Sequence, residues 1–167
     1  MAIHLARQAG VMFCTFGDAM RVPGSELSLL QAKAQGADVR TVYSPSDALT
    51  LARNNPTREV IFFGIGFETT APSTALVLRE AKRSNVRNFS VFSNHITIMP
   101  TMQALLDAED VQLDGFVAPG HVTMVIGEAP YQLITDHYKK PLVISGFEPL
   151  DVLQSVAMLI EQLIAGE

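Results

Sequence analysis

Short apolar segments that alternate with helical patterns constrain the fold of this 167-residue chain. The clearest apolar segment is 60–63, a run of β-branched and aromatic residues that ends at Gly64 and is typical of a buried strand. Strands that alternate with helices usually pair in parallel through right-handed crossovers. The sequence therefore predicts an α/β fold with parallel sheets and flanking helices. The predicted strands are 11–15, 39–43, 60–63, 89–93, 115–117 and 142–145, and the predicted helices are 26–35, 48–53, 72–83, 100–107, 131–138 and 151–165.

A repeated Gly-Phe-Glu sequence suggests how the chain is divided. It follows the strand 60–63 as residues 66–68 and the strand 142–145 as residues 146–148. This repetition favours two similar Rossmann-like lobes around a cleft, with residues 1–86 in the first and 87–167 in the second. A single continuous α/β domain is the alternative, because no low-complexity linker separates the two halves.

Composition excludes several classes of protein. The net charge of −5 argues against a broad surface for nucleic acid or an anionic membrane, and no apolar run approaches the roughly 20 residues that span a bilayer. The single cysteine, Cys14, excludes an intrachain disulfide and cannot by itself hold an iron–sulfur cluster. We therefore expect a cytoplasmic protein.

Polar side chains follow the predicted strands. Glu68, Thr69 and Thr70 stand where the strand 60–63 gives way to a helix, and ligands of parallel α/β sheets bind at such carboxyl ends. His95 and His121 each follow a buried strand, and an imidazole can bind a metal, act as a base or clamp a ligand. Alternatively, each histidine holds its own loop by bonding backbone carbonyls. The spacing alone does not decide between these interpretations.

Four further side chains have two interpretations each. Cys14 is a nucleophile or a soft-metal ligand, or a small core residue, and its apolar strand favours the core. Asp18 and Arg21 contact an anionic ligand or form an ion pair that closes their loop, and the ion pair is favoured. Glu148 is paired with Glu68 as a second carboxylate of the site, or both acids simply stabilise helix N-termini.

Glycines after the strand 60–63 give only weak support to a nucleotide site. Gly64 and Gly66 match the first two glycines of a dinucleotide-binding turn, but Thr69 stands where the third is required. The chain also lacks a Gly-Lys-Ser/Thr phosphate loop. A nucleotide is therefore a poor candidate ligand.

Successive motifs along the chain resemble those of the HypD family of [NiFe] hydrogenase maturation proteins. These motifs are CTFGD at 14–18, RVPGS at 21–25, GFETTAP at 66–72, NH at 94–95, DGF at 114–116, PGHV at 119–122 and GFEPLD at 146–151. The resemblance covers nearly the whole chain, in the family's order and spacing. It implies a scaffold rather than a free-standing enzyme, which works with the chaperone HypC and the cyanide donor HypE on an iron that carries cyanide and carbon monoxide.

The chain departs from the family pattern in its cysteines. Full-length members have two α/β lobes and a C-terminal [4Fe-4S] region, whereas this chain lacks the upstream Cys-Gly-Thr-His and Cys-Pro-x-Cys segments and the downstream cluster cysteines. The resemblance therefore implies the central part of such a protein, inactive alone and without a cofactor of its own. An excised fragment and a short gene product both agree with this interpretation.

The resemblance also gives the strand-end side chains a role. It implies that Glu68, Thr69, Thr70, His95, His121 and Glu148 line the cleft for the Fe(CN)₂CO group, with Cys14, Asp18 and Arg21 as secondary candidates. His121 is the best candidate for a contact to the iron or its cyanide ligands. The alternatives are an independent small-molecule binding or transferase domain that uses the same cleft, and an interaction module that binds HypC without chemistry.

Overall fold

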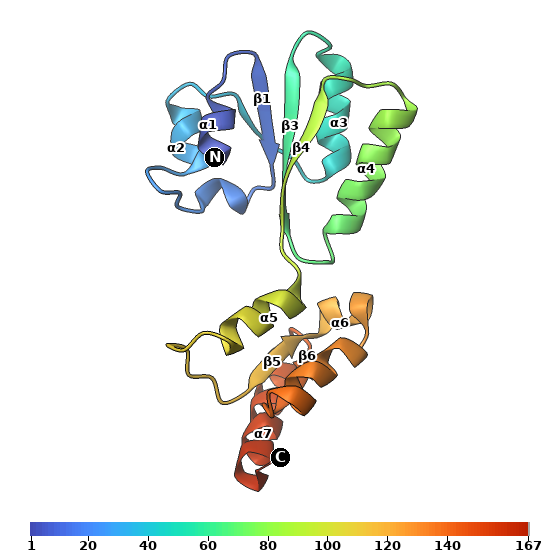
Figure 1. Ribbon diagram of the computed structural model, residues 1–167. Coiled ribbons are helices and arrows are strands. Elements are labelled where there is room, and N and C mark those ends of the chain that lie inside the picture. Colours follow the sequence, from blue (N-terminus) through green and yellow to red (C-terminus); the bar gives the residue numbers. More distant parts are fainter. Residues whose placement is uncertain (167) are drawn as a thin grey trace. The chain divides into compact units, whose positions relative to one another are not determined.

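Parallel strand pairing organises the chain, which the computed structural model describes over residues 1–166 (Figure 1). The strands are β1 (Val11–Thr15), β2 (Val39–Thr41), β3 (Glu59–Gly66), β4 (Phe89–His95), β5 (Phe116–Pro119) and β6 (Leu142–Ser145). One sheet has the order β2-β1-β3-β4, the other pairs β5 with β6, and every pair is parallel. The predicted α/β class with parallel sheets is confirmed.

Helices occupy the segments between the strands. They are α1 (Ala2–Ala6), α2 (Leu29–Ala34), α3 (Pro45–Asn54), α4 (Ala71–Arg83), α5 (Ile98–Leu106), α6 (Gly120–Ile126) and α7 (Pro149–Ala165), with short helical turns η1 (Ala19–Arg21), η2 (Ala129–Tyr131) and η3 (Leu133–His137). No helix within residues 1–166 is both long enough and apolar enough to cross a bilayer.

The chain forms two compact units. The first contains Met1–Gly66 and Thr70–His95, and the second contains Phe67–Thr69 and the residues from Ile96 onward. Because the segment Phe67–Thr69 leaves the first unit and returns to it, the polypeptide passes between the units three times. Strand β4, which lies beyond the predicted boundary at residues 86 and 87, pairs with β3 in the first unit. That the chain forms two similar Rossmann-like lobes around a cleft stays a prediction.

The first unit has an apolar layer on each face of its sheet. Successive side chains of a strand point to opposite faces, so Met12 and Cys14 pack on one face while Phe13 packs on the other. Residues of α3 and α4 cover the first face, and residues of α1 and α2 cover the second (Figure 1). All five residues of β1 are buried, as expected for a strand inside a parallel sheet that is covered on both faces.

Several local predictions differ from the structure: the predicted strand 39–43 ends at Thr41, and the predicted helix 131–138 is replaced by the short turns η2 and η3. Helix α2 begins after Ser28, whose side chain accepts from the Gln31 backbone in a capping box, so the predicted start near Ser25 is wrong. The three intervening residues stay outside the helix. Helix α6 was not predicted, because Pro119 and Gly120 are typical of a turn, whereas here they begin a helix.

An ion cluster joins the amino-terminal ends of β1, β2 and β3. Asp38 pairs with Arg40 and with Arg58, whose guanidinium also donates to the Val11 carbonyl at 3.0 Å. The hydrogen bond from Arg40 lowers the pKa of Asp38 below its usual value, and Arg58 adds to this effect while burial opposes it. The carboxylate therefore stabilises the fold only while it is ionised.

This cluster predicts how stability depends on pH. A carboxylate whose pKa is lowered by folding contributes stability above its unfolded pKa of about 3.9, and the contribution is lost as the pH falls through the folded pKa. Asp38→Asn should therefore destabilise the chain at pH 7 and have a diminishing effect below about pH 4. Urea unfolding between pH 7 and pH 3 measures this, with Asp110→Asn, an exposed carboxylate, as the control. An Asp38→Asn effect that is the same at every pH would contradict the assignment.

The environment of Thr15 predicts that its replacement by valine does not lower the free energy of unfolding. Its side chain is fully buried at the end of β1, and its hydroxyl oxygen has no hydrogen-bond partner within residues 1–166. Valine has nearly the same shape without the polar atom, so Thr15→Val should be neutral or stabilising by up to about 2 kcal/mol. The reverse change at an equally buried site, Val60→Thr, should cost about 1–3 kcal/mol. Urea midpoints compare the two, and a large loss in Thr15→Val would reveal a partner for the hydroxyl.

Candidate functional site

His95 lies at the carboxyl end of β4 in the first unit, where two hydroxyl groups hold its ring. Nδ1 is 3.1 Å from the Ser93 hydroxyl, and Nε2 is 3.5 Å from the hydroxyl of Thr74 on α4. Burial lowers the pKa of His95 below its usual value of 6.5, because a less hydrated site disfavours the charged form. The ring is therefore neutral at pH 7, and its partners are side-chain hydroxyls rather than the backbone carbonyls of the alternative interpretation.

Gly64 makes room for this ring. A Cβ atom at position 64 would lie 2.6 Å from Cε1 of His95, which is closer than side chains approach one another. The pairing of β3 with β4 sets Gly64 opposite Ser93 and Gly66 opposite His95, so the glycines of β3 run beside the histidine. Gly66, the first residue of the GFETTAP motif, therefore lies opposite His95 in the sheet. The imidazole ring packs against Gly64, two residues earlier.

Gly66 and Thr70 shape the turn that follows β3. Gly66 has φ +129°, a conformation that residues with a Cβ rarely adopt, and a Cβ there would meet the Thr70 side chain. The Thr70 hydroxyl donates to the Ile65 carbonyl at 3.4 Å. Thr70 therefore supports the turn, whereas Thr69 is exposed within the segment that belongs to the second unit.

Glu68 stabilises a helix that is distant in sequence. Its Oε1 accepts from the backbone N–H of Ile98 at 2.8 Å, at the start of α5, where Thr97 makes no side-chain cap of its own. A carboxylate at a helix N-terminus is favoured by the unpaired N–H groups and by the helix dipole. The other oxygen, Oε2, is buried without a hydrogen-bond partner within residues 1–166. Glu68 thus has one oxygen that caps α5 and one buried oxygen without a partner within residues 1–166.

His121 and Glu148 lie on neighbouring turns of the second unit. His121 stands in the first turn of α6, directly after β5, and Glu148 is the residue that precedes α7, after β6. The turns are close, because a Cβ at Gly120 would lie 2.7 Å from the Ser145 carbonyl oxygen. The ring of Phe147 contacts that of His121, with centroids 4.8 Å apart, and both side chains are exposed. This edge presents an imidazole, an aromatic ring and a carboxylate to solvent.

The secondary candidates have structural environments. Cys14 is fully buried, and burial raises the pKa of its thiol to about 12, so it is a protonated core residue as its strand indicated. Asp18 accepts from the Ala19 backbone N–H at 2.8 Å and caps η1. No ion pair joins Asp18 to Arg21 in the described chain, so the predicted loop-closing pair is wrong: the carboxylate is turned to the backbone and Arg21 is exposed.

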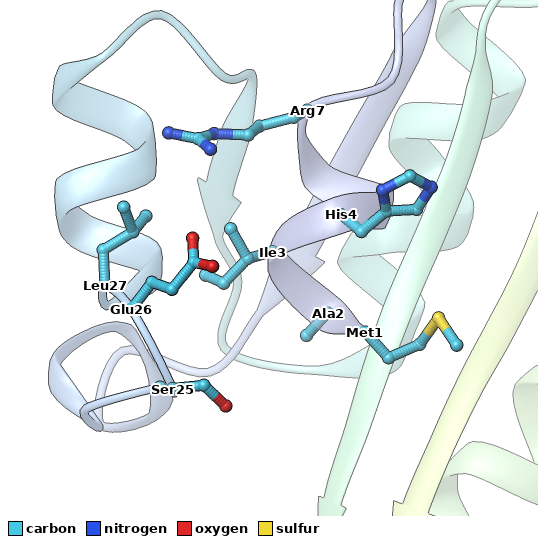
Figure 2. A pocket seen from close by; sticks show the side chains of 9 residues that line it. Met1, Ala2, Ile3, His4, Arg7, Ser25, Glu26 and Leu27 are labelled. Carbon is cyan, nitrogen blue, oxygen red and sulfur yellow. The ribbon is translucent and has the colours of Figure 1, made fainter.

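A hollow of about 450 Å³ in the first unit lies elsewhere (Figure 2). It is bounded by α1 and by residues 24–27, and Figure 2 shows the Glu26 carboxylate beside Ile3. None of the nine candidate residues lines it. The candidate residues therefore do not line this hollow.

The donor set does not fit a resident metal cluster. Within residues 1–166, no group of three or more His, Cys, Asp or Glu side chains is placed to hold a metal ion. The single cysteine is buried and protonated, whereas a [4Fe-4S] cluster requires several thiolates.

Comparisons with known proteins relate the whole chain to one family. The family model HypD, described as "Hydrogenase formation hypA family", matches residues 1–167. The chain is 62% identical over 164 residues to the hydrogenase maturation factor HypD of Rhodobacter capsulatus and 59% identical to that of Escherichia coli K12; each match covers 98% of this chain and 44% of the relative. It is 53% identical to the hydrogenase expression/formation protein HupD of Azotobacter chroococcum, covering 99% of this chain and 45% of that protein. The chain thus spans less than half the length of these relatives.

The packing of His95 on Gly64 predicts the effect of a single methyl group. Gly64→Ala should displace the ring, cost about 1–3 kcal/mol of stability and bring the pKa of His95 closer to its usual value as the ring becomes better hydrated. The control is Gly17→Ala, which also follows a strand but whose Cβ would meet only a methyl carbon of Thr41, at 3.4 Å. NMR titration of His95 and urea unfolding measure both effects. An unchanged His95 titration in Gly64→Ala would show that the contact does not position the ring.

Proposed function

The chain belongs to the HypD family, and we propose that it forms part of a hydrogenase maturation factor whose strand-end groups contact the iron group during its assembly. The observation that carries the proposal is the 62% identity to a hydrogenase maturation factor over nearly the whole chain. Because less than half of that relative is matched, the remaining steps of maturation are assigned to the rest of such a protein.

The exposed edge of the second unit supports a contact to the iron cargo. Cyanide nitrogen accepts hydrogen bonds, and the His121 ring, which lies against the ring of Phe147, can donate one. The packing of Gly120 against Ser145 holds the two turns together, so the imidazole is presented from a fixed backbone. His121 therefore orients the Fe(CN)₂CO group, which is the substrate of assembly and is bound by thiolates outside this chain.

Glu68 has a positioning role in the same proposal. Its bond to Ile98 fixes the segment that carries Thr69, whose exposed hydroxyl is a second donor for a cyanide or carbonyl ligand. Both ring nitrogens of His95 lie within hydrogen-bond distance of a hydroxyl, so a contact from this ring to the ligand would have to replace one of these two contacts. Binding of a HypC-type chaperone and of a HypE-type cyanide donor belongs to the proposal as well.

An exchange of segments tests this proposal. The matching region of the Escherichia coli relative is replaced by this chain, and hydrogenase activity is measured in a strain that lacks its own copy of the relative. The full-length hybrid should restore activity, and the 167-residue chain alone should not. In the hybrid, His121→Ala should lower activity about 10- to 100-fold, as expected when a group that orients a metal's ligands is removed.

His137→Ala is the matched control. That histidine is also exposed and also contacts an aromatic ring, Tyr138, but it lies in η3 and not at a strand end. The control should retain activity within about twofold. A hybrid that accumulates without activity would contradict the proposed function, and equal losses in the two variants would remove the special role of His121. Iron with cyanide and carbonyl infrared bands on the chain alone would contradict the need for outside thiolates.

A further inference from the structure

Charge is divided unequally between the two units of the chain. The first unit contains ten Lys or Arg and six Asp or Glu, whereas the second contains two Lys or Arg and eleven Asp or Glu. The net charge of −5 therefore combines a basic first unit with a strongly acidic second unit. Charged surfaces act on each other over about 10 Å at 0.1 M salt, so the first unit of one molecule attracts the second unit of another.

The basic charge of the first unit is concentrated near the end of α4. Four of its ten cations lie within residues 79–87, namely Arg79, Lys82, Arg83 and Arg87. The same stretch holds one acid, Glu80, which pairs with Arg53 of α3 at 3.0 Å and with Arg83 at 2.9 Å. Arg79 has no ion pair in the part of the chain that the structure describes. This end of α4 therefore has cationic groups in excess of their carboxylate partners.

A hollow on α4 combines these cations with an exposed apolar side chain. It measures about 560 Å³ and is lined by Leu76, Arg79, Glu80 and Arg83. Residues at intervals of three and four lie on one side of a helix, and the buried residues of α4, at positions 74, 77 and 81, lie on the other side. Leu76 is 54% exposed. The four lining residues are called the α4 face below.

Helix stability alone accounts for only part of the α4 face. Cations in the last turn of a helix are favoured by the helix dipole, which explains Lys82 and Arg83. Arg79 precedes that turn, and an exposed leucine among arginines does not interact with the dipole. Guanidinium groups bind carboxylates through two parallel hydrogen bonds, and arginine is enriched where proteins meet. The α4 face therefore suits an acidic segment that also carries an apolar side chain.

A segment of this kind lies in the second unit. Residues 107–114, between α5 and β5, have the sequence DAEDVQLD, with four acids and no cation. The Tyr138 hydroxyl donates to Asp107 at 2.8 Å and anchors the start of the segment. The exposed residues that follow include Glu109, Asp110 and Val111. Neither Glu109 nor Asp110 forms an ion pair within residues 1–166. Residues 107–114 are called the acidic segment below.

We propose that the α4 face of one molecule binds the acidic segment of a second copy of this chain. The arginines of the face pair with Glu109 and Asp110, and Val111 contacts Leu76. Exposed ion pairs are individually weak and are screened by salt, so the association is reversible and strongest at low ionic strength. Neither surface contains a residue of the candidate iron site, and the proposal is independent of the contact to iron.

Sedimentation velocity of the 167-residue chain tests the proposal. At about 100 µM protein the mean mass should exceed that of a monomer in about 20 mM salt and fall to the monomer mass in about 500 mM salt. Arg79→Glu and Asp110→Arg should each weaken association at least about tenfold, because each variant sets like charges against each other.

Two controls carry the same charge reversals elsewhere. Lys33→Glu alters an exposed cation of α2 in the first unit, and Glu128→Arg alters an exposed acid of the second unit. Each should change association by less than about threefold, because a single exposed charge outside the contact has little effect. These controls separate a defined contact from the general attraction between a basic and an acidic unit.

A mixture of the two contact variants provides a rescue. The Arg79→Glu molecule retains its acidic segment, and the Asp110→Arg molecule retains its α4 face, so these unaltered surfaces bind each other in the mixture. Association should return to within about threefold of that of the original chain. A misfolded variant would not give this recovery, and circular dichroism of each variant shows independently whether it folds.

Four results would overturn the proposal. The first is a monomer at low salt, and the second is an association that persists in high salt, which would indicate apolar contacts instead. The third is an equal loss in the contact variants and in their controls. The fourth is a mixture in which the two contact variants, each folded, stay monomeric. None of these results bears on the hydrogenase activity of the hybrid protein, so the two proposals fail separately.

Discussion

The parallel pairing of β3 with β4 is the constraint on which the first unit's candidate site depends. The register sets Gly66 opposite His95 and Gly64 opposite Ser93, so a strand without side chains at two positions runs beside the histidine. The imidazole fills the space that a Cβ at Gly64 would occupy, and Thr74 reaches it from α4. Sheet register, glycine spacing and the start of α4 therefore have to agree for His95 to hold its position. In the second unit, the close approach of Gly120 to the Ser145 backbone fixes the turn from which the His121 side chain extends.

The Gly-Phe-Glu repeat has a shared structural basis. Gly66 is the last residue of β3 and Gly146 directly follows β6, and at each a Cβ would meet a side chain at the start of the following helix, Thr70 in one copy and Asp151 in the other. The glutamates differ, because Glu68 caps α5 while Glu148 precedes its own helix α7. The sequence repeat thus reflects a similar tight turn from strand to helix, while the acids that follow it serve different helices.

Local signals in the sequence were sufficient for the fold class, and long-range contacts were not predictable. The six strands were recognisable because apolar β-branched runs end at glycine or polar residues. Helix α6 was missed because a proline and a glycine at its start are typical of turns. The partner of Glu68 lies 30 residues away at Ile98, and no periodic pattern encodes such a pairing. The turn of Asp18 toward its neighbouring backbone depends likewise on geometry that spacing alone does not contain.

The excursion of Phe67–Thr69 into the second unit affects how these units could be separated. A single cut after His95 would keep Glu68 with the first unit and leave the Ile98 N–H at the start of α5 without its acceptor. Neither unit therefore corresponds to one continuous stretch of the sequence. Recombination at a single point could not exchange one unit without also changing the other. A segment that preserves this helix cap has to run at least from Glu68 to the start of α5, and it therefore includes α4 and β4 of the first unit.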